Sequence, residues 1–210
     1  ASFLSAGTIS WLYYSDRLVE FPLAIFGIAI ATVILPFLSQ KSAESSIEDF
    51  SLTLGWALRI ILIISVPAIA GLILLSKPLI TTFFYRGEFS QIDVEMASLS
   101  LVAYSLGLLS FILVKIFSTG YFSRQDTKTP VKIATICVIL NMILNIFFVL
   151  LLINFNYHAP HIGLALATSI SSSINMYLLF IGLKKNKLIE FPSNWKKLFF
   201  QIITSTIIMS

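Results

Sequence analysis

The chain has 210 residues, of which 57% are hydrophobic and 11% charged, and its mean hydropathy is +0.93. Soluble domains carry about 25% charged residues, so this composition excludes an ordinary water-soluble domain and predicts a protein whose solvent is lipid. The net charge of +4 does not indicate nucleic acid, because most Lys and Arg flank apolar runs, as in membrane proteins. Cys137 is the single cysteine, which excludes an intramolecular disulfide and a Cys-rich metal site.

Long apolar runs divide the chain into predicted transmembrane helices, each needing about 20 residues to cross a bilayer. These runs cover residues 8–39, 54–75, 97–121, 131–153 and 161–183, and a truncated sixth begins near Leu198. Because barrel strands would alternate over about ten positions, the runs predict an all-α, polytopic membrane helix bundle, with 1–210 as one transmembrane domain. The first residue is Ala1 and the last run stops at Ser210, so we expect a fragment of a larger protein.

Basic residues are divided unevenly between alternate connectors. The second and fourth connectors hold only Lys77 and Arg86. The remaining connectors and their flanks hold Lys41, Arg124, Lys128, Lys132, Lys184, Lys185, Lys187, Lys196 and Lys197. The positive-inside rule therefore predicts that the connectors after the first, third and fifth helices are cytoplasmic.

The first run is too long to cross a membrane as one upright helix. Residues 8–39 would extend about 48 Å, whereas the hydrocarbon core is about 30 Å thick. Pro22 and Pro36 can bend or break this helix, because proline removes a backbone hydrogen bond; Gly27 is a further candidate bending point. We expect Thr8 or Ser10 to cap its start.

Charged residues lie inside this first run. If the helix starts near Thr8, Arg17 lies about 14 Å along its axis, close to the middle of the bilayer. A charge at that depth is costly and usually faces a water-filled cavity or a partner, so Arg17, with Asp16 and Glu20, is the candidate substrate-binding group. The alternative is a helix that starts near Ser15, which would place these charges at the membrane interface.

Polar side chains also occur in the fourth and fifth runs. Asn141 and Asn145 share a helix face, and Thr168 lies in a Ser-rich run. Two interpretations stay open: a tightly packed helix pair joined by side-chain hydrogen bonds, or a cation site made of amide and hydroxyl oxygens. His158 and His161 fall in a connector without a nearby carboxylate or Cys, and we expect a solvated loop there.

Two motifs stand out in the chain. The first is WLYYSDRLVEFP at 11–22 with GIAIATVILP at 27–36, and the second is GYFSRQDTKTPV at 120–131. Together they resemble the signature of one transporter family, the MurJ (MviN) lipid II flippases of the multidrug/oligosaccharidyl-lipid/polysaccharide (MOP) exporter superfamily. The resemblance implies a MATE-like transporter of about fourteen helices in two lobes. This chain would match the C-terminal lobe, from the eighth helix to the start of the thirteenth.

The resemblance also implies a function without covalent catalysis. The family moves lipid II, an undecaprenyl-diphosphate-linked peptidoglycan precursor, from the cytoplasmic to the periplasmic leaflet of the bacterial inner membrane by alternating access. Its implied partners are lipid II, membrane lipids and the N-terminal lobe of the same chain. Arg17 matches a cavity arginine of the family, and a guanidinium can hold a diphosphate with two parallel hydrogen bonds. Asp16 and Glu20 match its acidic companions.

The resemblance implies no cofactor, but it leaves the driving force open. Asn141, Asn145 and Thr168 lie where some members of the family bind sodium. Asn145 puts an amide where an acid would bind a cation better, so coupling to Na⁺ and driving by the membrane potential alone are both open.

Three alternatives to a flippase remain at this point. The first is a polysaccharide-unit or multidrug exporter of the same superfamily. The second is a membrane-embedded polyprenyl-phosphate transferase, which would need the loop residues Glu88, Asp93 or Asp126 or the two His. The third is a scaffolding subunit, in which Arg17 would be dispensable.

Overall fold

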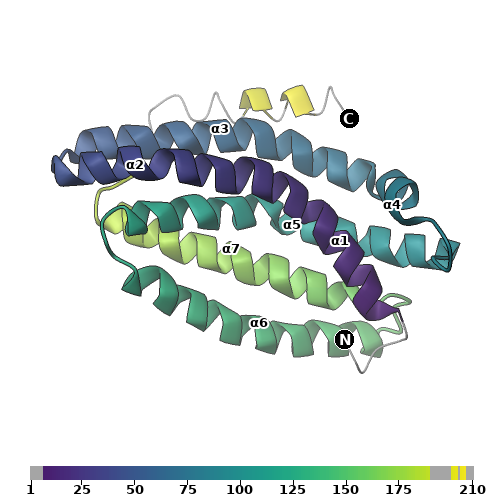
Figure 1. Ribbon diagram of the computed structural model, residues 1–210. Helices are drawn as coiled ribbons and strands as arrows, with labels where there is room; N and C mark the ends of the chain where they lie inside the picture. Colours follow the sequence, from purple (N-terminus) through teal and green to yellow (C-terminus); the bar gives the residue numbers. More distant parts are fainter. Residues whose placement is uncertain (1–6, 190–199, 203, 207–210) are drawn as a thin grey trace.

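Every regular element of the described residues is a helix. A computed structural model describes residues 7–189, 200–202 and 204–206 (Figure 1). The elements are α1 (Thr8–Pro22), the π-helical segment η1 (Leu23–Ile28), α2 (Ala29–Ala43), α3 (Ile47–Leu74), α4 (Ser76–Phe84), α5 (Gln91–Phe122), α6 (Lys128–Asn154) and α7 (Ile162–Lys185). Five helices are long and apolar enough to cross a membrane, which confirms the five predicted runs. Residues 200–202 and 204–206 are helical, where the sixth run is predicted.

The first membrane helix is continuous from Thr8 to Ala43 and contains a wide turn. Six residues immediately after Pro22 are π-helical, and Gly27 lies buried among them. A Cβ at Gly27 would lie 3.2 Å from the Leu23 side chain and 3.4 Å from that of Ile112 on α5, so a side chain at this position would be crowded mainly within the wide turn itself. Pro36 lies inside α2 and is exposed.

The predicted helix cap is wrong. Neither Thr8 nor Ser10 caps α1; the N-cap is Gly7, whose φ of 95° lies in the left-handed region. Glycine adopts that region without steric cost because it has no Cβ. The helix thus begins at Thr8, and the alternative start near Ser15 is wrong as well.

The central helix of the bundle is α5. The most apolar window of α5 is 61% buried, against 6% for α6. The segment from α1 to α3 packs on one side of α5, α7 packs on the other, and α6 lies beyond α7 (Figure 1). Much of α6 therefore presents apolar side chains outward from the bundle.

Small residues bring α5 and α7 together. Ser169 donates a hydrogen bond to the Ala103 carbonyl at 2.8 Å, and the Ser110 and Ser173 hydroxyls are 2.9 Å apart. At Gly107 a Cβ would lie 2.8 Å from the Cα of Ser169, so the backbones are too close for any side chain there. Contacts of this kind join membrane helices, because lipid supplies no hydrophobic driving force between them.

We expect Gly107→Ala to destabilise the full-length protein. The added methyl group would force α5 and α7 apart, at a cost of about 1–3 kcal/mol. The measurement is the thermal unfolding midpoint in detergent. Gly55→Ala is the matched control, because nothing lies within 4 Å of a Cβ at Gly55. The control should be neutral or stabilising, since alanine favours helix; equal midpoints for the two variants would contradict this packing.

The connector predicted at 76–95 contains the short helix α4, which the sequence analysis missed. With 9 residues, α4 is too short to form an apolar run of membrane length. Its Pro78 lies in the first turn, where a missing backbone N–H costs nothing. This helix lies at the same end of the bundle as the starts of α1 and α5 (Figure 1).

Candidate functional site

Arg17 lies on the exposed face of α1. Its Nη1 donates to Glu20 Oε2 at 2.8 Å, and the two side chains are 55% and 48% exposed. Its guanidinium carbon is 4.9 Å from the centre of the Tyr13 ring, a distance typical of a cation–π contact. The cation is therefore held in place by its own helix and remains accessible to a ligand.

The opposite face of α1 fixes the helix to the bundle. Ser15 is fully buried and donates to the Ala97 carbonyl of α5 at 2.7 Å. Side chains two residues apart on a helix point in different directions, so this anchoring turns Arg17 away from α5. Because α1 begins at Thr8, Arg17 lies about 14 Å along the helix axis.

Asp16 is not part of this ion pair. Its side chain is exposed, and within the described part of the chain no ion pair involves its carboxylate. The structure therefore pairs Arg17 with Glu20 and not with Asp16.

The three residues of the candidate cation site meet between α6 and α7. Asn145 Nδ2 donates to Asn141 Oδ1 at 3.0 Å, and Asn141 Nδ2 is 3.5 Å from Thr168 Oγ1. Thr168 itself donates to the Leu164 carbonyl at 2.9 Å. Ser171 adds a bond to the Cys137 carbonyl at 2.7 Å. Side-chain hydrogen bonds thus join α6 and α7 at these residues.

One oxygen in this chain of amides lacks a partner. Asn145 Oδ1 is buried and, among the described residues, accepts no hydrogen bond. A cavity of about 290 Å³ lies beside these hydrogen-bonded side chains. It is lined by Asn141 and Thr168, together with Ser171, Ser172 and Asn175. The described residues contain no cluster of His, Cys, Asp and Glu that could hold a metal ion, and the residues that line this cavity are uncharged.

The expectation of a solvated His161 is wrong. The residue is only 1% exposed, its Nε2 is 3.1 Å from the Met96 carbonyl, and its ring centre is 4.9 Å from that of Trp11. Trp11 in turn donates to Asp93 Oδ1 at 2.6 Å. His161 thus fills the space where α1, α5 and the start of α7 meet, a contact between distant parts of the chain that no local pattern indicates. His158 is exposed, as expected.

We expect this burial to make stability depend on pH. Burial lowers the pKa of His161 below its ordinary value of 6.5, because the charged ring is poorly solvated there. Below 6.5 the unfolded chain therefore binds a proton that the folded protein does not, and stability falls by at most about 1.4 kcal/mol per pH unit until the folded pKa is passed.

The measurement compares thermal midpoints of the full-length protein at about pH 7.5 and about pH 5.5, on either side of the ordinary histidine pKa. His161→Gln should reduce the loss of stability at the lower pH. His158→Gln is the comparison variant: the exposed His158 contributes less than burial to the lowered pKa of His161, so its replacement should change the loss of stability less than His161→Gln does. The same pH dependence in His161→Gln and wild type would contradict the assignment.

Comparisons with known proteins agree along the whole chain. The family model described as "Lipid II flippase MurJ" matches residues 1–210. A probable lipid II flippase MurJ of Vibrio cholerae is 52% identical over 183 residues, covering 87% of this chain and 34% of that protein. One from Haemophilus influenzae is 47% identical over 216 residues, covering 100% of this chain and 41% of that protein.

A solved structure has the same fold. "Lipid II flippase MurJ, inward closed conformation" matches with a TM-score of 0.81 and 35% sequence identity, over 99% of this chain and 41% of that chain. The chain thus spans well under half the length of the proteins it matches. Its sequence, its helices and the family match together show that the chain belongs to the MurJ family of lipid II flippases.

Proposed function

We propose that the full-length protein is a lipid II flippase and that residues 1–210 form one of its lobes. It would move the lipid-linked peptidoglycan precursor from the cytoplasmic to the periplasmic leaflet by alternating access against its N-terminal lobe, without covalent chemistry. The observation that carries this proposal is Arg17, a guanidinium exposed on one face of the lobe inside a membrane-length helix.

The Arg17–Glu20 pair suits reversible binding of a diphosphate. Glu20 neutralises Arg17 while no substrate is bound, and both side chains are about half exposed. Exposed ion pairs contribute little to stability, so exchanging the carboxylate for a diphosphate costs little. The guanidinium keeps its charge throughout and can bind two oxygens at once.

We further propose the orientation and location of the lobe. The end that contains α4 holds Lys77 and Arg86, while the opposite end of the described residues holds Lys41, Arg124, Lys128, Lys132, Lys184, Lys185 and Lys187; Lys196 and Lys197 lie outside the described residues. This asymmetry supports a bacterial inner-membrane protein with the connectors after the first, third and fifth membrane helices in the cytoplasm. The end with α4 would then face the periplasm.

A sodium ion between α6 and α7 is our proposal for the driving ion. Asn145 Oδ1 is a buried acceptor without a partner among the described residues, and leaving such an oxygen unbound costs about 1–3 kcal/mol. Asn141 Oδ1 accepts from the Asn145 amide nitrogen, and Thr168 Oγ1 lies 3.5 Å from the Asn141 amide nitrogen, so two further oxygens belong to the same group of side chains. These neutral donors would hold Na⁺ more weakly than a site with a carboxylate. The membrane potential would then drive Na⁺ into the site, and binding of the ion would favour one conformation of the protein.

The flippase proposal is tested by expressing the full-length parent protein in a bacterium depleted of its own lipid II flippase. Growth and outer-leaflet lipid II are scored for wild type and Arg17→Ala at matched protein levels. Rescue by wild type with loss in the variant supports a flippase whose Arg17 binds substrate. Failure of well-expressed wild type would overturn the lipid II assignment and favour another cargo of the superfamily. Rescue by Arg17→Ala would contradict the proposed role of Arg17.

A further inference from the structure

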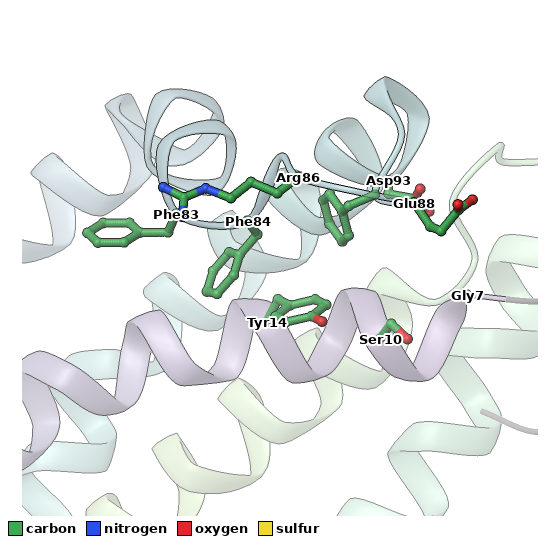
Figure 2. Close-up of a pocket in the computed structure, with 9 residues that line it drawn as sticks. Gly7, Ser10, Tyr14, Phe83, Phe84, Arg86, Glu88 and Asp93 are labelled. Carbon is green, nitrogen blue, oxygen red and sulfur yellow. The ribbon is translucent and has the colours of Figure 1, made fainter.

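A second cavity lies at the proposed periplasmic end of the lobe, outside the ion pair of Arg17. It has a volume of about 470 Å³, within the range of about 300–1,000 Å³ usual for ligand pockets. Figure 2 shows that α1 forms its base with Ser10 and Tyr14, while Phe84 of α4 and residues of the α4–α5 connector close it from above.

The middle of this pocket is aromatic and well supported. Tyr14 packs against Phe84 and Phe89, with ring centres 4.6 Å and 5.3 Å apart. Three rings from three segments of the chain therefore hold one another in position. Such a surface offers apolar contact to a ligand at little entropic cost, because aromatic side chains have few rotatable bonds.

Opposite charges lie at the two ends of the pocket. Figure 2 shows Arg86 extending over Phe83 at one end, whereas Glu88 and Asp93 lie at the other end, toward Gly7. Both carboxylate oxygens of Asp93 already accept hydrogen bonds within the protein, from Trp11 at 2.6 Å and from the Ser90 backbone at 2.7 Å. Within the described residues, Arg86 and Glu88 form no ion pair. The pocket thus offers one cation and one anion to a ligand.

The pocket also lines up with Arg17. Ser10, Tyr14 and Arg17 are spaced i, i+4, i+7 and so share one face of α1. Ser10 lies about 10 Å from Arg17 along the helix axis, a span of about three extended peptide residues. A substrate whose diphosphate is bound by Arg17 could therefore extend its polar part into this pocket.

We propose that this pocket binds the peptide part of the lipid-linked precursor on the periplasmic side, an inference that rests on the proposed function. Peptidoglycan precursors carry a sugar and a peptide, and the peptide has free carboxylates and an amino group. Arg86 would bind a carboxylate, Glu88 the amino group, and the rings of Tyr14, Phe84 and Phe89 the aliphatic chain between them. The pocket would hold the headgroup after it has crossed the membrane.

The test uses the purified full-length protein and a soluble N-acetylmuramyl pentapeptide, which has neither lipid nor diphosphate. Binding is measured by calorimetry for wild type, Arg86→Gln, Glu88→Gln and the matched control Lys77→Gln, an exposed basic residue of α4 that does not line the pocket. We expect saturable binding that weakens about fivefold in each pocket variant and is unchanged in the control. N-acetylmuramic acid without the peptide should bind much more weakly.

Several outcomes would overturn the inference. Equal affinity in all four proteins, displacement of the probe by inorganic pyrophosphate, or equal binding of the peptide-free sugar would each do so. A wild-type protein that rescues the flippase-depleted bacterium but does not bind the probe refutes the pocket and leaves the flippase proposal standing. A protein that binds the probe as expected but does not move lipid II refutes the proposed function instead.

Discussion

Full-length protein carrying Arg17→Lys should fail to rescue a flippase-depleted bacterium, although the positive charge is kept. Arg17 is exposed and held by Glu20 at 2.8 Å and by the Tyr13 ring. Lysine is a point charge that cannot form two parallel bonds to a diphosphate. Losing one bond to a charged group costs about 1.5–3 kcal/mol, which corresponds to a fall in transport of about ten- to hundredfold.

The control for this experiment is Arg59→Lys. Arg59 is an exposed arginine of α3, so its replacement makes the same chemical change away from α1 and should leave rescue intact. Protein levels in the membrane are measured in parallel, because a folding defect would lower abundance. Full rescue by Arg17→Lys would show that charge alone is sufficient and that two-point binding by the guanidinium is not required.

Sodium should raise the thermal midpoint of the full-length protein relative to potassium at equal ionic strength. At about ten times its Kd a ligand stabilises the folded state by about 1.4 kcal/mol, and for a chain of 150–250 residues this is about 3–6 °C, with a smaller shift in a longer protein. Thr168→Val should abolish the difference between the two salts, because it removes the hydroxyl that lies beside Asn141.

Thr135→Val is the matched control for the sodium experiment. Thr135 and Thr168 each donate to the carbonyl four residues before them at 2.9 Å, but Thr135 is exposed and does not line the cavity beside the amides. Its replacement should leave the sodium effect intact. A midpoint that is the same in the two salts for wild type would refute the sodium site and leave only the packed helix pair.

The membrane helices could be predicted from sequence because their signal is local and strong. A run of about 20 apolar residues has few alternatives to a membrane helix. The short helix α4 has no such signal, since its 9 residues are too few to be recognised by hydropathy. His161 could not be placed either, because its burial depends on Trp11 and on Met96, which lies 65 positions away.

In the candidate site, too, some features follow from local spacing and others depend on how the helices pack. Helical spacing alone indicates that Arg17 can reach Glu20, and the structure has this pair. Spacing also puts Asn141 beside Asn145. The approach of Thr168, and the burial of Asn145 Oδ1 without a partner among the described residues, depend on how α6 and α7 pack. The pocket between α1 and α4 involves three separate segments, and its parts are recognisable only once they are folded together.

The π-helical segment acts as a one-residue insertion in an otherwise regular pattern. Buried positions in α1 follow α-helical steps and end at Pro22, and the next is Gly27, one residue later than an α-helix would place it; Ile34 and Leu38 continue the shifted series. Each α-helical residue turns the chain by about 100°. Suppose that the π-helical turn shifted along the helix toward its N-terminus, to a place before Arg17. The guanidinium would then rotate by about that angle around the helix axis while α2 stayed in place. Displacing one wide turn along the helix would thus be enough to reorient the charge without moving the helix as a whole.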